Sequence, residues 1–462
     1  MHLHFLGICG TFMGSLAQLA KSAGHQVSGC DANVYPPMST QLELAGIELI
    51  EGFDPVQLQP APDLIIVGNA MSRGNPCVEY MLDQKLAYTS GPQWLGDNIL
   101  KNKYVISVSG THGKTSTSSM LAKILDTVGY HPGYLIGGVP QNFGISARIG
   151  GTAADGKKYF VIEADEYDTA FFDKRSKFVH YHSDSLIINN LEYDHADIFD
   201  DLASIQRQFH HCVRILPSSG NVIFPADDAA VLEVLEQGCW SQQKSFGADN
   251  APWQYKLLKE DGSQFAVLHT SSAEESTVNW QQSGLHNVNN AMAAIVAAAE
   301  IGISLKQACD ALSAFVGIKR RMESIYSAQN ITVYDDFAHH PTAIKTTLAG
   351  LRAKVGDAHI IAVIEPRSAT MKLGVHQQEL GAAVADADQV MWYQNTSIDW
   401  SLSSVAMGCF FPATVSEDID RLLNDVLQVI SLNQNVGKPT HIVIMSNGSF
   451  EGFHRLLVDQ LE

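Results

Sequence analysis

Residues 107–117 read SVSGTHGKTST. A phosphate-binding P-loop follows the pattern G-x-x-x-x-G-K-[ST]. Here Gly113, Lys114 and Thr115 match its second half, whereas Val108 stands where the first glycine is expected. The surrounding residues therefore have to show whether this is a nucleotide-binding loop or an ordinary tight turn.

The context of this stretch favours a nucleotide-binding loop. A β-branched run precedes Gly110, and a helical pattern follows Lys114 until Gly129. The N-terminus of such a helix directs free backbone N–H groups at an anion. Lys114 can then reach the β- and γ-phosphates of a nucleotide, and the hydroxyl of Thr115 can ligate Mg²⁺.

Length and composition predict a multidomain globular enzyme. The chain has 462 residues, of which 45% are hydrophobic, and it carries a formal net charge of -19. This charge argues against nucleic acid as a main partner. The seven cysteines form no C-x-x-C pair, so we expect reduced thiols, no zinc site built from them and a cytoplasmic location. We expect neither an export signal nor a membrane span, because the Ala-rich run at 291–299 is too short to cross a bilayer.

Short apolar runs alternate with helical patterns along the whole chain, which is typical of α/β folds with parallel sheets. We predict a Rossmann-like domain at 1–98, a central P-loop ATPase-like domain at 99–316 and a C-terminal Rossmann-like domain at 317–462. A hairpin is expected between 254–258 and 264–268, turning on Asp261-Gly262. The predicted strands lie near residues 4–6, 26–28, 48–50, 64–67, 104–109, 160–162, 186–188, 222–224, 332–334, 359–364, 389–392 and 441–445.

The form G-T-x-G-K-[ST], followed in order by several other motifs, resembles the Mur ligase family of ATP-dependent ligases. Residues 160–168, FVIEADEYD, resemble its acidic motif at a strand end, where ligands of open α/β sheets gather. Residues 188–195, INNLEYDH, resemble its N-x-x-x-D-H element. The resemblance implies that Thr115, Glu166 and His195 hold magnesium, while Asp194 either orients His195 or ligates through water.

The resemblance also implies the rest of the ATP site. The H-N-x-x-N motif matches His286, Asn287 and Asn290, and the two asparagines lie three apart on one helix face, where they either read adenine or cap the helix. Arg321 and Asp336 match motifs associated with the phosphates and ribose, although Phe337 replaces a tyrosine. The expected ATP-binding residues are Gly110, Thr111, His112, Gly113, Lys114, Thr115, Ser116, His286, Asn287, Asn290, Arg321 and Asp336, with Lys114, Glu166 and His195 as the catalytic group.

The first domain is expected to bind the UDP part of a sugar nucleotide. Gly7 and Gly10 suggest a dinucleotide fingerprint, but Cys9 and Phe12 occupy two of its glycine positions, so NAD is disfavoured. Asp31 either accepts a hydrogen bond from the nucleoside or caps a helix. The expected substrate-binding residues are Gly7, Cys9, Gly10, Asp31, Asn69, His339, Arg367 and Lys372.

Further features indicate which branch of the family the chain resembles. No lysine occurs between Lys177 and Lys244, so the carbamylated lysine of one subgroup is absent, as in the members that act on UDP-N-acetylmuramate. Residues 33–40, 68–76, 171–178 and 365–371 resemble the branch that attaches murein tripeptide to this sugar during recycling of cell-wall peptide. A guanidinium such as that of Arg367 binds a peptide carboxylate well.

The implied reaction uses ATP and Mg²⁺ to activate the lactyl carboxylate as an acyl phosphate, which the amine of the tripeptide then attacks. Closure of the domains about Gly317 would assemble the site. Three alternatives remain open: a ligase that adds L-alanine to the same sugar, an ATP-binding switch or motor, and an NAD-dependent oxidoreductase.

Overall fold

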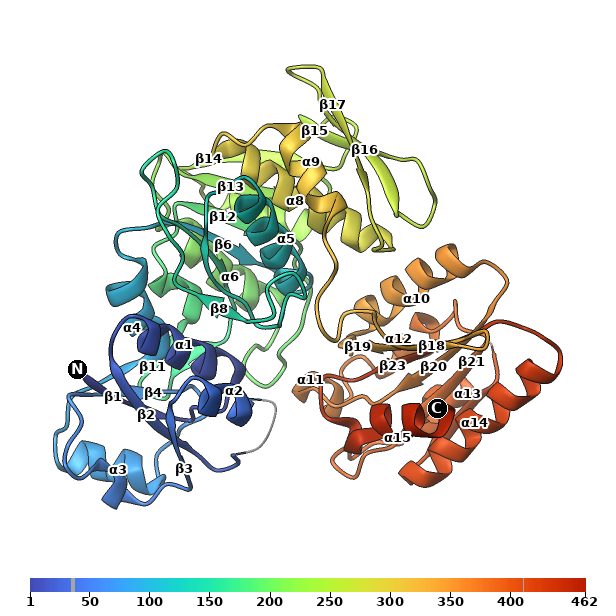
Figure 1. Ribbon diagram of the computed structural model, residues 1–462, viewed down its shortest axis with the longest axis horizontal. Coiled ribbons are helices and arrows are strands. Elements are labelled where there is room, and N and C mark those ends of the chain that lie inside the picture. Colours follow the sequence, from blue (N-terminus) through green and yellow to red (C-terminus); the bar gives the residue numbers. More distant parts are fainter. Residues whose placement is uncertain (35–37, 410) are drawn as a thin grey trace.

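The computed structural model describes residues 1–34, 38–409 and 411–462. Residues 35–37, part of the 33–40 stretch discussed above, lie outside it. The described strands form sheets of five, ten and six strands and one two-stranded ribbon, and the chain passes through the three larger sheets in order (Figure 1). The α/β architecture with three successive sheets is therefore confirmed, while the domain boundaries near 98 and 316 stay predictions.

The first sheet is wholly parallel and has the strand order β3-β2-β1-β4-β5. Its alternation of short strands and helices is the Rossmann-like pattern that the sequence predicts. Its elements are β1 (His2–Leu6), α1 (Thr11–Ser22), β2 (Gln26–Asp31), α2 (Met38–Leu44), β3 (Glu48–Glu51), the 3₁₀ turn Pro55–Leu58, β4 (Leu64–Val67), α3 (Pro76–Asp83), β5 (Tyr88–Ser90), α4 (Gly91–Leu95) and a π-helical turn at Gly96–Leu100.

The central sheet has the order β17-β16-β15-β14-β13-β12-β6-β9-β7-β8 and is parallel from β15 to β7. The predicted hairpin is confirmed, because β15 and β16 pair antiparallel. Its strands are β6 (Tyr104–Ser109), β7 (Gly133–Leu135), β8 (Ala147–Arg148), β9 (Tyr159–Glu163), β12 (Ser185–Ile188), β13 (Asn221–Pro225), β14 (Gln242–Phe246), β15 (Trp253–Leu257), β16 (Gln264–His269) and β17 (Glu274–Asn279).

Helices cover the central sheet, and the ribbon between β9 and β12 reaches the first part, where the ring centre of Phe172 lies 5.0 Å from that of Tyr88. The helices are α5 (Lys114–Thr127), α6 (Leu202–Val213), α7 (Ala229–Glu236), α8 (Leu285–Glu300) and α9 (Leu305–Ser313), with a 3₁₀ turn at Lys177–His180; the ribbon pairs β10 (Asp168–Ala170) with β11 (Asp173–Ser176). Helix α8 packs on α5 through alanines that are almost completely buried. Small side chains allow these two helices to approach closely.

The third sheet has the order β18-β19-β23-β20-β21-β22, with only the edge strand β18 antiparallel to its neighbour. Helices cover both of its faces (Figure 1). The elements are β18 (Glu323–Ala328), β19 (Ile331–Asp336), α10 (Pro341–Val355), β20 (His359–Ile364), α11 (Ala369–Lys372), α12 (Gln377–Ala383), β21 (Gln389–Tyr393), α13 (Ser403–Met407), β22 (Ala413–Ser416), α14 (Ile419–Asn435), β23 (Thr440–Met445), the 3₁₀ turn Phe450–Gly452 and α15 (Phe453–Leu461).

The three parts of the chain contact one another in different ways. One apolar cluster runs without a break from the first sheet, through Leu16 and Trp94, to one face of the central sheet at Phe160. The third sheet has apolar clusters of its own, and polar contacts join it to the central part. Within the described residues, none of the helices is long and apolar enough to cross a bilayer.

A pair of glycines brings the third part close to the central one. Gly350 lies on α10, and a Cβ atom at this position would be 2.7 Å from the Cα of Gly284, at the start of α8. Two real atoms do not approach this closely, so a side chain at position 350 has to displace one helix from the other. The absence of a side chain at Gly350 therefore sets how closely α10 approaches α8.

We expect Gly350→Ala to separate the third part from the central part while leaving α10 folded, because alanine favours helix over glycine by about 1 kcal/mol. Small-angle scattering should show an increased radius of gyration, and circular dichroism should show unchanged helix content. Ala349→Leu is the control, because Ala349 is the exposed neighbour on the same helix. An unchanged radius in Gly350→Ala would mean that the contact is dispensable.

Candidate active site

The predicted P-loop lies at the carboxyl edge of the central sheet, between the end of β6 and the start of α5. Gly113 caps the helix with φ at +80°, in the left-handed region that glycine adopts without strain. A Cβ atom there would also lie 2.2 Å from Oδ1 of Asn290 on α8. Glycine is thus required at position 113 for two independent reasons.

Neighbouring chain segments fix the first half of the loop and leave its second half available. The N–H of Thr111 donates to the carbonyl of Asn190, and the N–H of His112 donates to the Asn190 side chain. Within the described residues, the N–H groups of 113–116 have no protein acceptor. These four donors can form the expected anion cradle. Within the predicted loop, Thr111 and His112 are held by Asn190, and residues 113–116 supply the N–H groups that can bind an anion.

Lys114, Glu166 and His195, the predicted catalytic group, lie together. Nζ of Lys114 is 3.0 and 3.2 Å from the carboxylate oxygens of Glu166, and Nε2 of His195 is 3.0 Å from Oε1 of the same carboxylate. The Glu166 side chain is only 2% exposed and that of Lys114 only 12%. Burial lowers the pKa of Lys114, but the surrounding carboxylates outweigh it and raise the pKa overall, so the lysine is charged.

Asp165 and Lys177 form a second ion pair beside this group. Nζ of Lys177 donates to Asp165 at 2.9 Å. Burial raises the pKa of Asp165, but the charges of Lys177 and Lys114 outweigh burial and lower it, so the carboxylate is ionised. Asp165, Glu166 and His195 each offer a ligand atom within 4.8 Å of the others. Two carboxylates and an imidazole fit a divalent cation, so the donor set suits the expected magnesium.

Glu163, the last residue of β9, orients the other predicted metal ligand. The hydroxyl of Thr115 donates to Glu163 at 3.1 Å, and the N–H of Gly137 donates to it at 2.7 Å. Burial is the main cause that raises the pKa of this carboxyl group. The predicted metal ligands Thr115 and Glu166 both lie close to Lys114: Thr115 follows it in the chain, and Glu166 is its ion-pair partner at the sheet edge where ligands of such folds gather.

His195 is held by a contact that crosses between parts of the chain. Its φ is +57°, an uncommon value for a residue other than glycine, and its N–H donates to its neighbour Asp194. The hydroxyl of Thr370, from the third part, donates to the same Asp194 oxygen at 2.7 Å and accepts from the N–H of Ala196. Asp194 thus fixes the backbone at His195. Its two expected roles, orienting the imidazole and ligating through water, stay predictions.

The two asparagines of the predicted adenine motif make different contacts. Asn290 is buried, and its Oδ1 accepts from the hydroxyl of Thr117 in α5. Asn287 donates to the carbonyl of Ser283, four residues earlier, which is a local helix-end contact. Burial lowers the pKa of His286 to about 4, so its imidazole is neutral. Asn290 therefore supports the P-loop, and adenine contacts by any of the three residues stay a prediction.

Arg321 and Asp336 come together at the start of the third part. The carboxylate of Asp336 accepts from the N–H groups of Met322 and Ala338, which fixes the connector beside β19. The guanidinium of Arg321 lies 4.7 Å from the ring centre of Phe337. The phenylalanine that replaces the family tyrosine thus provides an aromatic face for a cation, a role that needs no hydroxyl.

In the loop after β1, two of the predicted substrate-binding residues use their N–H groups for bonds within the protein. The N–H groups of Gly7 and Ile8 donate to the Cys30 carbonyl, and the N–H of Cys9 donates to Asp31 at 2.9 Å. Asp31 therefore holds the loop, and the donors of Gly7 and Cys9 are already used. Gly10 caps α1 without a side-chain hydrogen bond, so the N–H groups of the first turn of α1 are the ones that can meet a phosphate.

The other predicted substrate residues lie at exposed or half-buried positions. Arg367 is exposed and packs against Gly448, and the described residues offer its guanidinium no hydrogen-bond acceptor. Asn69 is exposed, and Lys372 is half-buried at the end of α11. His339 hydrogen-bonds the carbonyl of Phe337, and burial lowers its pKa. Substrate contacts by these four residues stay predictions.

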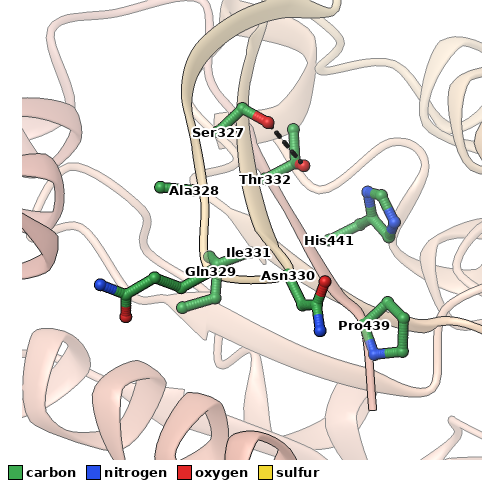
Figure 2. Close-up of a pocket in the computed structure, with 8 residues that line it drawn as sticks. All are labelled: Ser327, Ala328, Gln329, Asn330, Ile331, Thr332, Pro439 and His441. Atoms are coloured by element: carbon green, nitrogen blue, oxygen red, sulfur yellow. Dashed lines mark hydrogen bonds between the residues drawn. The ribbon is translucent and has the colours of Figure 1, made fainter. Parts of the chain in front are cut away.

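A pocket of about 310 Å³ lies elsewhere, at the turn between β18 and β19 (Figure 2). Gln329 and Asn330 form its tip, and Pro439 and His441 line one side. None of the predicted site residues lines it. The P-loop edge, with its buried charges and available donors, is the better candidate for chemistry.

Sequence reasoning missed several residues that shape this edge. Glu163 and Asp165 stand inside the quoted acidic motif, so that motif already contained the signal. Asn190 likewise lies in the INNLEYDH stretch. Thr370 gave no signal beyond its place in the 365–371 stretch, because its role depends on a contact across 176 residues.

The fold and the site are those expected of an ATP-using enzyme: three α/β parts, with a P-loop and with carboxylates suited to a metal ion at the central sheet edge. Family models agree along the chain: Mur ligase family, catalytic domain, matches residues 2–103; Mur ligase middle domain matches 108–298; and Mur ligase, glutamate ligase domain, matches 320–448. The chain belongs to the Mur ligase family, whose members are ATP-dependent ligases.

Individual relatives resemble the chain over most of its length. It is 52% identical to the UDP-N-acetylmuramate–L-alanyl-γ-D-glutamyl-meso-2,6-diaminoheptandioate ligase of Haemophilus influenzae, over 100% of this chain and 99% of the relative. The crystal structure of a murein peptide ligase from Psychrobacter arcticus matches with a TM-score of 0.77 and 49% identity, covering 100% of this chain and 98% of that one. The UDP-N-acetylmuramate–L-alanine ligase of Acetivibrio thermocellus is 32% identical over 84% of this chain and 80% of the relative.

We expect Thr370→Val to weaken the metal site, because it removes the hydroxyl that joins Asp194 and Ala196 while keeping the side-chain shape. Leaving a buried donor or acceptor unpaired costs about 1–3 kcal/mol. The Mg²⁺ concentration for half-maximal turnover should therefore rise roughly tenfold, since about 1.4 kcal/mol corresponds to a factor of ten. Thr370→Ser, which keeps the hydroxyl, should behave as wild type. Equal Mg²⁺ dependence in all three proteins would contradict this role.

Proposed function

We propose that this protein joins the lactyl carboxylate of UDP-N-acetylmuramate to the amine of L-alanyl-γ-D-glutamyl-meso-2,6-diaminoheptandioate, with ATP as the energy source. The observation that carries the proposal is the 52% identity, over the whole chain, to a ligase named for these substrates. Its relative that adds L-alanine is less similar, at 32% identity over 84% of the chain.

The site residues suit the activation of a carboxylate. A carboxylate does not acylate an amine unaided, so the γ-phosphoryl group of ATP is transferred to it and gives an acyl phosphate. Lys114 and the N–H groups of 113–116 hold the phosphates, and magnesium at Thr115, Glu166 and His195 would neutralise the charge that develops during transfer. Catalysis of this kind consists mainly of positioning and charge stabilisation.

The amine substrate would enter from the third part. Arg367 has an exposed guanidinium and lies three residues before Thr370, whose hydroxyl contacts the loop of His195. A guanidinium holds a carboxylate through two parallel hydrogen bonds, and a tripeptide offers several carboxylates where L-alanine offers one. The amine then attacks the acyl phosphate and releases inorganic phosphate.

Closure of the third part would assemble the site. The first and central parts share an apolar core, whereas the third part meets the central one through polar contacts and the Gly350 approach. Polar interfaces of this kind permit relative movement. Substrate-driven closure about Gly317 would therefore bring Arg367 closer to the nucleotide, on the side where Thr370 already contacts Asp194.

We also propose a cytoplasmic location for this protein. Its seven cysteines form no disulfides, which suits a reducing compartment.

The choice of amine is tested by supplying the tripeptide and L-alanine separately, with UDP-N-acetylmuramate, ATP and Mg²⁺, and measuring products by mass spectrometry. We expect kcat/KM for the tripeptide to exceed that for L-alanine by at least about a hundredfold, because a site built for polar groups rejects ligands that lack them. Preference for L-alanine would overturn the substrate assignment. Hydrolysis of ATP without any need for the sugar nucleotide would favour a switch or motor instead.

We expect Lys114→Ala to lower turnover by at least roughly a hundredfold, the scale for loss of one charge-stabilising group. The matched control is Lys123→Ala, which removes a half-buried lysine further along α5. Circular dichroism should show that both variants are folded, and phosphate release should be measured with both substrates present. Near-normal turnover of Lys114→Ala would reject the role of this residue.

A further inference from the structure

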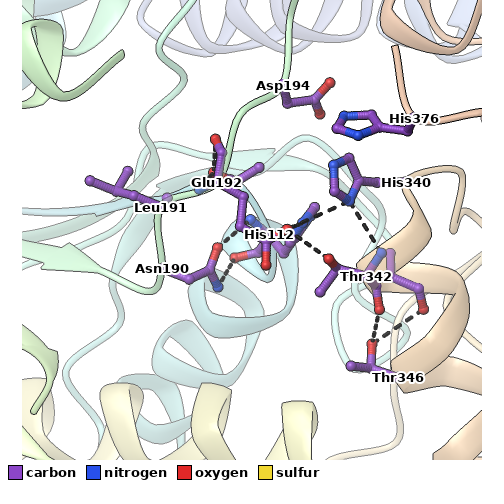
Figure 3. A network of polar contacts seen from close by, with 12 residues as sticks. His112, Asn190, Leu191, Glu192, Asp194, His340, Thr342, Thr346 and His376 are labelled. Carbon is purple, nitrogen blue, oxygen red and sulfur yellow. Dashed lines mark hydrogen bonds and ion pairs between the residues drawn. The ribbon is translucent and has the colours of Figure 1, made fainter. Parts of the chain in front are cut away.

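A second cluster of metal-ligating side chains lies where the P-loop meets the third part of the chain. His112 belongs to the P-loop, Glu192 follows β12, and His340 caps α10 (Figure 3). In the described part of the chain, this is one of two groups whose ligand atoms all lie within 4.8 Å of one another. The other is the Asp165, Glu166 and His195 group described above.

The spacing of the three groups suits a small tetrahedral cation. Nε2 of His112 is 3.1 Å from Oε2 of Glu192, and Nδ1 of His340 is 3.6 Å from the same oxygen. Ligands about 2.0–2.1 Å from a tetrahedral zinc ion lie about 3.3 Å apart. The observed separations fall on either side of this value, so small side-chain shifts are enough to complete the site.

The chemistry of the ligands distinguishes this cluster from the magnesium site. Two imidazoles and one carboxylate favour zinc and related transition metals, whereas the Asp165, Glu166 and His195 group has two carboxylates and is richer in the oxygen ligands that Mg²⁺ prefers. Burial is the main cause that lowers the pKa of His340, to about 3, so its imidazole is neutral near pH 7 and offers a lone pair. The hydroxyl of Thr342 donates to Oε2 of Glu192 at 2.7 Å and thereby orients the carboxylate.

His340 makes only a weak hydrogen bond through the nitrogen that would bind the ion. Its Nδ1 accepts from the N–H of Thr342 at 3.3 Å, a long contact, and it lies beyond hydrogen-bond distance from Glu192. The ring packs between those of His112 and His376, with centres 4.7 and 4.5 Å away. The imidazoles of His112 and His340 thus both lie near the carboxylate of Glu192, and a cation would give all three groups a common partner.

We propose that His112, Glu192 and His340 bind a zinc-class transition metal ion that joins the P-loop to the third part of the chain. Two ligands come from the central part and one from the third, so the ion binds best when these parts are in contact. By linkage, the bound ion stabilises that contact to the same extent. The proposal concerns a cation other than the catalytic magnesium, and it holds whichever amine the enzyme uses.

The test is calorimetric titration of the full-length, metal-free protein with Zn²⁺, in buffer with excess Mg²⁺ to occupy the other cluster. His340→Asn removes the imidazole but keeps a residue that caps helices well, and Glu192→Gln keeps the shape of the side chain without its charge. Each variant should bind Zn²⁺ at least about a hundredfold more weakly than wild type, because even residues behind the ligands contribute 10–100-fold to metal affinity.

His339→Gln is the control, because it removes the neighbouring imidazole, which bonds within its own loop. It should bind Zn²⁺ as wild type does. A second readout is thermal unfolding: Zn²⁺ should raise the Tm of wild type and of this control, and should leave the Tm of His340→Asn unchanged. Wild-type affinity in both ligand variants overturns the proposal, and so does loss of zinc binding on His195→Gln or on alkylation of the cysteines.

Discussion

The ion pair between Lys114 and Glu166 is the interaction on which the site depends. Both side chains are largely shielded from water, and a buried charge is stable only beside its opposite. The lysine that is to hold a phosphate is thus already neutralised by a carboxylate that is to hold a metal. A bare nucleotide that took the lysine would remove this cation from beside Glu166, which would then keep only the imidazole of His195 as a partner among the described residues. A nucleotide that brings its own cation would satisfy both groups at once, so we expect the site to prefer the metal complex of ATP.

Groups from several strands of the central sheet meet at this same edge. Strands β6, β9 and β12 end side by side, and each contributes a different group: the loop, the carboxylates and the asparagine pair that supports the loop. The third part then reaches this edge through Thr342 and Thr370, which contact Glu192 and Asp194 in the segment after β12. The segment after β12 therefore contacts both the P-loop, through His112, and the third part of the chain.

Much of this could be predicted from the sequence, because the information was local. The alternation of strands and helices, the glycine turn of the P-loop and the carboxylates at a strand end all follow from patterns within about ten residues. The uses of Gly7, Cys9 and Asn290 could not be predicted in the same way, since their hydrogen-bond partners come from other elements. Thr370 shows the limit most clearly, because a threonine carries no sign of a partner in another part of the chain.

The Ala-rich face of α8 limits which substitutions this protein tolerates near the P-loop. Its alanines let α8 approach α5, whose first turn carries the phosphate-binding N–H groups, and Asn290 on α8 touches the P-loop directly. A bulkier side chain on this face would tilt α5 and so misdirect those donors, even though it lies away from any substrate. Mutant libraries intended to broaden the range of accepted peptides should therefore leave α8 unchanged and concentrate their diversity on the loops of the third sheet.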